Sequence, residues 1–251
     1  MTITKKELDP FNCLLFDIAA HVNPKLLKDS DQFIAPPNTF DFKKLKEYRG
    51  LLSSVDFAAK KTAKYVIYFS EFYPVSDKIP PYEALEHHIH SYLEDLDILE
   101  NKLVTFLTTL KNDLKHVYPD EKSQVTMEFE VIVKKISRAF NGVSESRNPH
   151  HHKGSRYMDS DLLESQFAAT MLGWSHTFND LITDEGKEYL KKQEVEGFEK
   201  AKKIRIKQAE ENSEKITKLL NWLFKSLDKT IYEFLGIKHS AKLIGAKQNT
   251  K

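Results

Sequence analysis

The stretch PYEALEHHIHSYLEDLDILENKLVTFLTTLKNDLK, residues 81–115, contains a regular stripe of apolar side chains. The stripe has three- and four-residue spacing, and its members are Leu85, Ile89, Tyr92, Leu96, Leu99, Leu103, Phe106 and Leu110. That spacing brings all of them to one face of an α-helix. Pro81 suits the first turn, because its missing N–H would have no partner there. The stretch therefore predicts one long amphipathic helix.

Four other segments have the same apolar spacing and predict helices, at residues 41–72, 121–140, 162–181 and 184–235. Asn141 and Gly142 are typical of a helix end. A continuous helix over 184–235 would be on the order of 75 Å long, so we expect a break near Gly197 or docking on a partner. No segment has the alternation of a strand.

These patterns predict an all-α fold, an antiparallel helical bundle with a long C-terminal helix. We expect an irregular lead-in at 1–40 that contains one short helix around residues 11–21, a helical bundle at 41–182, and a basic C-terminal helical region with a frayed tail at 183–251. All 9 prolines lie at or before Pro149, so no proline interrupts the later helices.

Composition places the chain among reduced, intracellular proteins. Its 251 residues include one cysteine, the N-terminus lacks a secretory signal, and no apolar run is long enough for a membrane span. We therefore expect a cytoplasmic protein with no membrane partner. Residues 187–251 hold 16 Lys and Arg against 9 Asp and Glu, which is typical either of a nucleic-acid or membrane partner or of a solvated helix face, and the solvated face is favoured.

The hexapeptide RNPHHH, residues 147–152, concentrates strong hydrogen-bond donors between two predicted helices. Asn148 is a good helix N-cap and Pro149 a good first helical residue. In that frame Arg147 and His152 occupy the two positions whose side chains meet across a helix entrance. The free backbone N–H groups of His150 and His151 would then favour an anion such as phosphate.

A guanidinium beside a histidine is suited to RNA cleavage through the ribose 2′-hydroxyl. The fixed charge and the helix end both disfavour imidazolium, so neutral imidazole remains available as a base. The arginine can stabilise charge that develops on the phosphate. This chemistry needs neither a metal nor a cofactor, and we expect none.

RNPHHH matches the arginine-x4-6-histidine signature of HEPN domains, and the continuation RYMDSDLLE resembles the segment that opens the next helix in that family. The resemblance covers about residues 81–182. It implies an all-α homodimer that acts as a metal-independent endoribonuclease in a toxin–antitoxin, phage-defence or RNA-processing system. It further implies that Arg147 contacts the scissile phosphate, His152 acts in acid–base chemistry and Asn148 orients the motif.

We also expect the substrate to be bound by His150, His151 and Arg156. Pro149 within the spacer and the two extra histidines depart from the family pattern, so which histidine acts stays open.

Other interpretations of the same residues remain open. RNPHHH fits a polar loop whose Arg147 pairs with Glu83, Glu86 or Glu94, and the whole chain fits a non-catalytic interaction or RNA-binding module whose C-terminal helix docks on a partner protein or RNA. The run HHIH, residues 87–90, could supply metal ligands with Asp95, but its spacing matches no standard motif and a solvated face is favoured. His88 or Tyr92 could line an RNA groove. We assign Cys13, Trp174 and Trp222 to packing.

Overall fold

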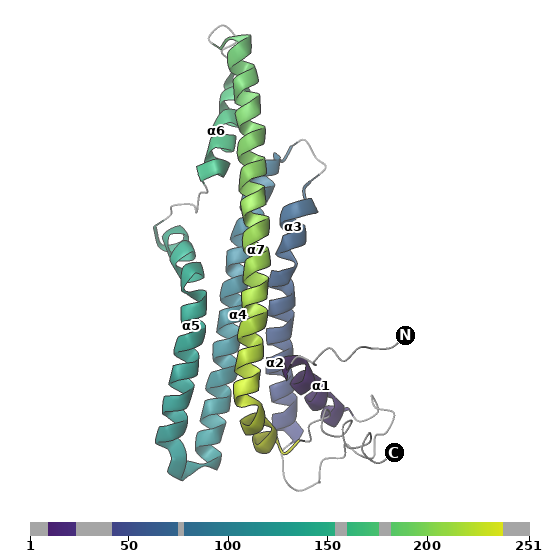
Figure 1. Cartoon of the computed structure of the whole chain (residues 1–251), viewed down its shortest axis with the longest axis vertical. Helices are drawn as coiled ribbons and strands as arrows, with labels where there is room; N and C mark the ends of the chain where they lie inside the picture. The colour runs from purple at the N-terminus through teal and green to yellow at the C-terminus, as the bar shows by residue number, and fades with distance from the viewer. Residues whose placement is uncertain (1–9, 24–41, 75–77, 154–159, 176–181, 238–251) are drawn as a thin grey trace. The chain divides into compact units, whose positions relative to one another are not determined.

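The computed structural model describes residues 10–23, 42–74, 78–153, 160–175 and 182–237, and of residues 142–153 and 175 it describes the backbone alone. The elements in chain order are α1 (Pro10–Val22), α2 (Phe42–Ala63), α3 (Tyr65–Glu71), α4 (Pro81–Val117), the short 3-10 helix η3 (Pro119–Glu121), α5 (Lys122–Lys153), α6 (Ser160–Ser175) and α7 (Asp184–Leu235) (Figure 1). These residues form helices and no strand. The predicted all-α helical bundle is confirmed.

Helix α4 has the apolar face that its sequence predicts. Every member of the stripe is buried: Leu85, Ile89, Tyr92, Leu96, Leu99, Leu103, Phe106 and Leu110. Since burial of a large apolar side chain stabilises a fold by about 1.5–3 kcal/mol, this one face is a large part of the core. The long α4 is therefore held by packing on its neighbours.

The described helices divide into two compact units, each assembled from segments far apart in the sequence. Unit 1 comprises residues 1–57, 100–138 and 215–251, and unit 2 comprises residues 58–99 and 139–214. Helices α2, α4, α5 and α7 each contribute a segment to both units.

Aromatic rings form the centre of unit 1. The ring of Phe11 stacks on that of Phe224 at 4.5 Å between centroids, and Phe224 also lies 5.6 Å from Phe106. Tyr48 contacts Phe106 and Phe234 edge to face. These contacts join α1, α2, α4 and α7, so the short α1 is fixed by the core of unit 1.

Unit 2 has its own aromatic centre. Tyr65 and Phe69 of α3 pack on Tyr92 of α4, with centroid distances of 4.9 and 5.6 Å to the Tyr92 ring. All three side chains are buried. The seven-residue α3 is therefore anchored by its rings.

The predicted helix over 41–72 is in fact two helices, α2 and α3, with a turn at Lys64. The N–H of Lys64 bonds to the carbonyl of Lys61, three residues back, and the hydroxyl of Thr62 bonds to the carbonyl of Ala59. Such hydroxyl bonds compete with the helix ladder, which gives a local reason for the turn. Apolar spacing alone did not reveal it.

The predicted end of a helix at Asn141 and Gly142, and a new start at Asn148, are wrong for the backbone. Helix α5 continues from Lys122 to Lys153 through all of these residues. Pro149 therefore lies within a helix, where it has no N–H to donate to the carbonyl of Glu145. Helix-stop residues end a helix only when the chain leaves the helical conformation there, and here it does not.

The predicted bounds of the C-terminal helix are confirmed, but the expected break near Gly197 is not found. Helix α7 runs uninterrupted through 52 residues. Gly197 serves a different purpose: a Cβ at this position would lie 2.7 Å from the carbonyl oxygen of Asp161 and 3.1 Å from the nitrogen of Ser165. The glycine lets α6 approach α7 closely.

Two polar contacts hold that approach. The Ser165 hydroxyl donates to the carbonyl of Glu194, and Lys200 Nζ lies 2.6 Å from Asp161 Oδ1. Helix α6 begins at Ser160, so Asp161 lies in its first turn. Within the described residues, no helix is both long and apolar enough to cross a membrane.

Candidate functional site: the RNPHHH segment and its surroundings

The RNPHHH segment lies in the C-terminal part of α5, within unit 2. The structure describes the backbone of Arg147, Asn148, His150, His151 and His152, and it is helical. Arg156 lies outside the described residues. The roles expected for these side chains therefore remain predictions, as does an ion pair of Arg147 with an acidic residue of α4.

The helical backbone changes the spacing argument for the motif. Residues four apart are neighbours on a helix, which relates position 151 to position 147. Position 152 lies about 140° around the helix axis from position 147, because each residue advances by about 100°. On this backbone the five-residue spacing of the signature does not bring positions 147 and 152 to one face.

The histidines of HHIH have protein contacts of their own. A ring nitrogen of His88 lies 2.6 Å from the carbonyl oxygen of Phe72, and His90 Nε2 lies 3.7 Å from Glu86. The contact of His88 links α4 to the residue that follows α3. The contact of His90 is an ordinary pair on one turn of α4. Among the described residues, no group of three His, Cys, Asp or Glu side chains could hold a metal ion.

Tyr92, which we considered as a wall of an RNA groove, is instead a core residue. It is buried, its hydroxyl accepts a bond from the Asn212 amide at 3.2 Å, and burial raises its pKa. His88 lies nearer the surface, beside the rings of Tyr68, Phe72 and Tyr73. Of these two residues, only His88 lies where a ligand could reach it.

Asp95 is the central polar residue of unit 2. Its carboxylate is buried, accepts from the Tyr65 hydroxyl at 2.7 Å, and lies 2.7 Å from Lys61 Nζ. Burial, followed by the bond to Asp95, raises the pKa of Tyr65. A buried carboxylate needs such partners to remain charged, so we assign Asp95 to stability rather than to metal binding.

Two similar pairs lie in unit 1. Tyr48 donates to Asp113 at 2.8 Å, and Lys44 lies 2.6 Å from the same carboxylate. The hydroxyl of Tyr232 donates to the buried Asp17. Burial, and then the neighbouring carboxylate, raise the pKa of both Tyr48 and Tyr232, so the hydroxyls stay protonated donors.

Some residues assigned to packing are confirmed there and one is not. Cys13 is buried, and Trp222 lies under Lys135, whose Nζ is 3.4 Å from the ring centroid. Trp174 is 56% exposed at the end of α6, so its assignment to packing is wrong. An isolated aromatic in an apolar stretch does not reveal from sequence whether another element covers it.

A groove in unit 1 escaped the sequence analysis. Its volume is about 590 Å³, and it is lined by Leu114, Tyr118, Glu121, Val125, Glu128, Phe129, Val131, Ile132, Ser226, Leu227, Thr230 and Glu233. The lining includes three glutamates and no lysine or arginine. Val125 and Phe129 belong to the helix predicted at 121–140, but a groove formed by three helices requires the tertiary structure.

A basic surface on α7 is the other feature that was not singled out. The run KAKKIRIK, residues 200–207, holds five cations and no acid. A hollow of about 720 Å³ lies against it. Its sequence signal was visible but was included in the general basic character of the C-terminal region.

No known family model, curated protein or solved structure is significantly similar to the chain.

Proposed function

We propose that the protein is a metal-independent endoribonuclease of the HEPN type, acting as a homodimer on RNA. The observation that carries the proposal is the segment RNPHHH in the C-terminal part of α5, followed in the sequence by RYMDSDLLE, in an all-α protein. The helical architecture is what the family resemblance requires. Arg147, the adjacent Asn148 and the three histidines supply every group that the reaction needs.

The proposed reaction breaks one phosphodiester bond and forms another. A neutral histidine of the motif, His152 by the family signature, takes the proton of the ribose 2′-hydroxyl. The 2′-oxygen attacks phosphorus and the 5′-oxygen of the next nucleotide leaves, taking a proton from a protonated histidine of the motif. Arg147 stabilises the charge on the phosphoryl oxygens. The products are a 2′,3′-cyclic phosphate and a 5′-hydroxyl, with no cofactor consumed.

The test is cleavage of a labelled single-stranded RNA in EDTA by the full chain. We expect cyclic-phosphate ends from the wild type and none from Arg147→Ala. Lys153→Ala, which changes a neighbouring cation outside the signature, serves as the control and should cleave normally. Cleavage by Arg147→Ala at the wild-type rate, with circular dichroism unchanged, would exclude the mechanism.

A second candidate, a protein-interaction module without catalysis, is favoured by the groove in unit 1. The floor is apolar, with Val125, Phe129 and Leu227 buried, whereas Val131 at its edge is 68% exposed. The carboxylates of Glu121, Glu128 and Glu233 give the lining one sign of charge. This chemistry fits an amphipathic helix of another protein that carries lysine or arginine beside its apolar face.

A further inference from the structure

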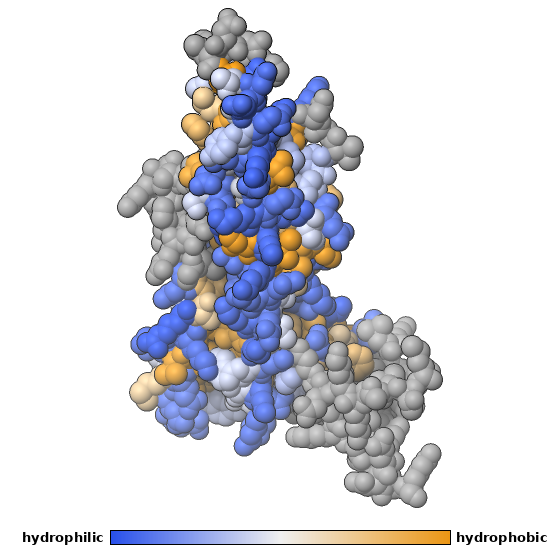
Figure 2. Space-filling model, turned by 45° about the horizontal axis from the view of Figure 1, so that its top comes forward, coloured by the Kyte–Doolittle hydropathy of each residue, from blue (hydrophilic) through white to orange (hydrophobic). Residues whose placement is uncertain are grey.

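The basic run of α7 presents a defined stripe of lysines. Lys200, Lys203 and Lys207 are three and four residues apart, so they share one face of the helix. Ala201 and Arg205, on another face, are buried. Figure 2 shows hydrophilic residues along the length of α7 on the face in view. The stripe is therefore a surface feature rather than part of the core of unit 2.

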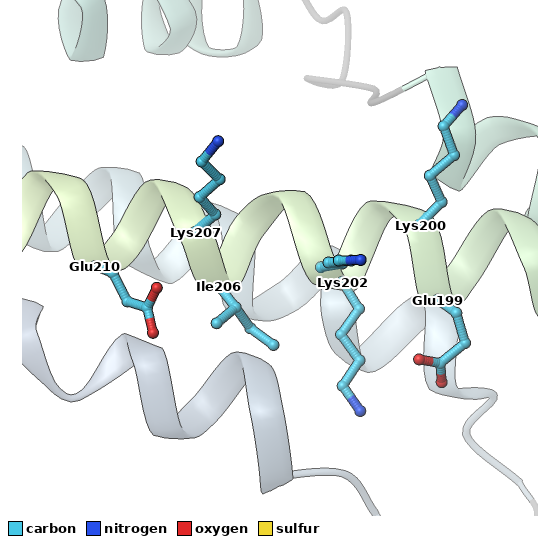
Figure 3. A pocket seen from close by; sticks show the side chains of 7 residues that line it. Glu199, Lys200, Lys202, Ile206, Lys207 and Glu210 are labelled. Carbon is cyan, nitrogen blue, oxygen red and sulfur yellow. The ribbon is translucent and has the colours of Figure 1, made fainter.

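A hollow of about 720 Å³ adjoins the stripe. Its lining is Glu199, Lys200, Lys202, Lys203, Ile206, Lys207 and Glu210. Figure 3 shows Lys200 and Lys207 pointing to the same side of α7, with Glu199, Ile206 and Glu210 on the other side. Four lysines against two glutamates leave the lining with a net charge of +2. We call these seven residues the lysine surface.

Two of the lysines already have neighbours that bear on the argument. Lys200 is paired with Asp161, so it contributes less free charge than its exposure suggests. Lys207 Nζ lies 4.0 Å from Glu211, a weak pair between exposed side chains. Lys203 is exposed. Lys203 and Lys207 are consequently the cations that an incoming anion can engage most readily.

Aromatic rings lie at the edge of the lysine surface. Lys202 Nζ is 5.1 Å from the ring centroid of Tyr73 and 5.8 Å from that of Phe198, and these two rings meet edge to face. The preceding residue, Phe72, is 65% exposed and lies beside His88. Cations that follow a phosphate backbone, with rings on which bases stack, are the usual elements of a surface for single-stranded nucleic acid.

We infer that the lysine surface, with Phe72, binds single-stranded RNA. Lys203 and Lys207 contact successive phosphates while a base stacks on Phe72. An acidic protein segment would satisfy the lysines but would leave no reason for the exposed ring of Phe72, which precedes Tyr73, the residue whose ring Lys202 contacts. The inference rests on the proposed function, because it names the binding surface for the same substrate within unit 2.

The experiment measures binding separately from cleavage. A fluorescein-labelled 20-nucleotide RNA of mixed, unpaired sequence is titrated with the Arg147→Ala protein, so that the RNA stays intact, and anisotropy is read at several salt concentrations. The test variant adds Lys203→Glu and Lys207→Glu. The matched control adds Lys191→Glu and Lys192→Glu, the same charge change on the same helix outside the lysine surface.

We expect the test variant to raise Kd by roughly tenfold or more and to lower the salt slope by about two, while the control shifts Kd by less than about threefold. Phe72→Ala should weaken binding by roughly five- to hundredfold, and Phe57→Ala, another exposed ring, should not. Equal losses in both lysine variants would overturn the inference, because only net charge would then matter.

Two further arms separate the alternatives. Binding of an acidic peptide but not of RNA would overturn the inference in favour of a protein partner, and equal binding of duplex RNA would overturn the single-strand assignment. RNA binding that depends on Lys203 and Phe72, in a wild-type protein that never cleaves, would refute the proposed enzyme and leave the binding surface standing. Unchanged RNA binding and unchanged cleavage in the lysine variants would overturn the binding surface and leave the proposed enzyme standing.

Discussion

Gly197 of α7 lies so close to Asp161 of α6 that a Cβ on the glycine would stand 2.7 Å from the Asp161 carbonyl oxygen. The obstructing atom belongs to the backbone, which cannot rotate away as a side chain could. The absence of a side chain at position 197 thus sets the distance between the two helices.

We predict that Gly197→Ala destabilises the protein by about 1–2 kcal/mol, because crowding costs about 1–3 kcal/mol and the gain in helix propensity offsets up to about 1 kcal/mol. Urea unfolding followed by circular dichroism measures the change. Gly173→Ala, where a Cβ would meet nothing within 4 Å, is the control in the same unit and should cause no loss. Equal stability of both variants would contradict the close approach.

Asp95 supports the second prediction, because two donors from other helices depend on it. Asp95→Ala leaves the buried Tyr65 hydroxyl without this acceptor, so we expect a loss of about 2–3 kcal/mol. Asp95→Asn keeps an acceptor oxygen and should lose less. Glu94→Ala, an exposed neighbour on the same helix, should be nearly neutral in the same unfolding measurement.

Tyr48 gives the third prediction, on pH. Its pKa in the folded protein is raised above the ordinary value of 10.0, by burial first and then by the bond to Asp113. The protonated hydroxyl therefore stabilises the fold fully below pH 10, and this contribution is lost as pH rises beyond 10. At pH 7 Tyr48→Phe should lower the free energy of unfolding by about 1–2 kcal/mol.

The difference between wild type and Tyr48→Phe should then shrink as unfolding is measured above pH 10. Tyr118→Phe serves as the control, because that ring is exposed and its substitution should give a small difference at every pH. A Tyr48→Phe difference that grows with pH would show that the sign of the linkage is wrong.

The sequence predicted what depends on local periodicity and missed what depends on contacts between distant segments. The α4 stripe and the bounds of α7 follow from three- and four-residue spacing, which any single helix displays. The turn at Lys64 and the function of Gly197 depend on hydroxyl bonding and on the approach of another helix. Helix ends are also hard to predict from residue types alone. Residues that favour a helix end can lie inside a helix, as Asn141, Gly142 and Pro149 do in α5. For the motif itself, residue types were visible and their geometry was not.

The groove of unit 1 supports a fourth prediction. A synthetic 18-residue amphipathic helix with leucine on one face and lysine beside it should bind the full chain, as measured by isothermal titration calorimetry. Glu128→Lys should weaken binding by roughly tenfold, since it replaces an attractive charge at the groove with a repulsive one. Glu130→Lys, two residues away and outside the lining, should have little effect. Equal weakening by both variants would exclude the groove as the binding site.

The last prediction concerns Pro149, which lies inside α5 without an N–H to continue the helix ladder. Because alanine restores that donor, Pro149→Ala should raise stability by about 1 kcal/mol, less than the full proline penalty since the helix ends at Lys153. No gain in urea unfolding would indicate that a helix begins at Pro149 rather than passing through it.

The same substitution tests how the motif works. Positions 147 and 152 diverge on an unbroken helix, so a reaction that uses Arg147 with His152 requires the helix to open at Pro149. We therefore expect His152→Ala to abolish RNA cleavage and Pro149→Ala to reduce it while the fold becomes more stable. If His151→Ala abolished cleavage instead, and Pro149→Ala left the rate intact, the helical register would be the active one. In that case position 151, one turn from Arg147, would supply the base, and the five-residue spacing of the signature would be coincidental.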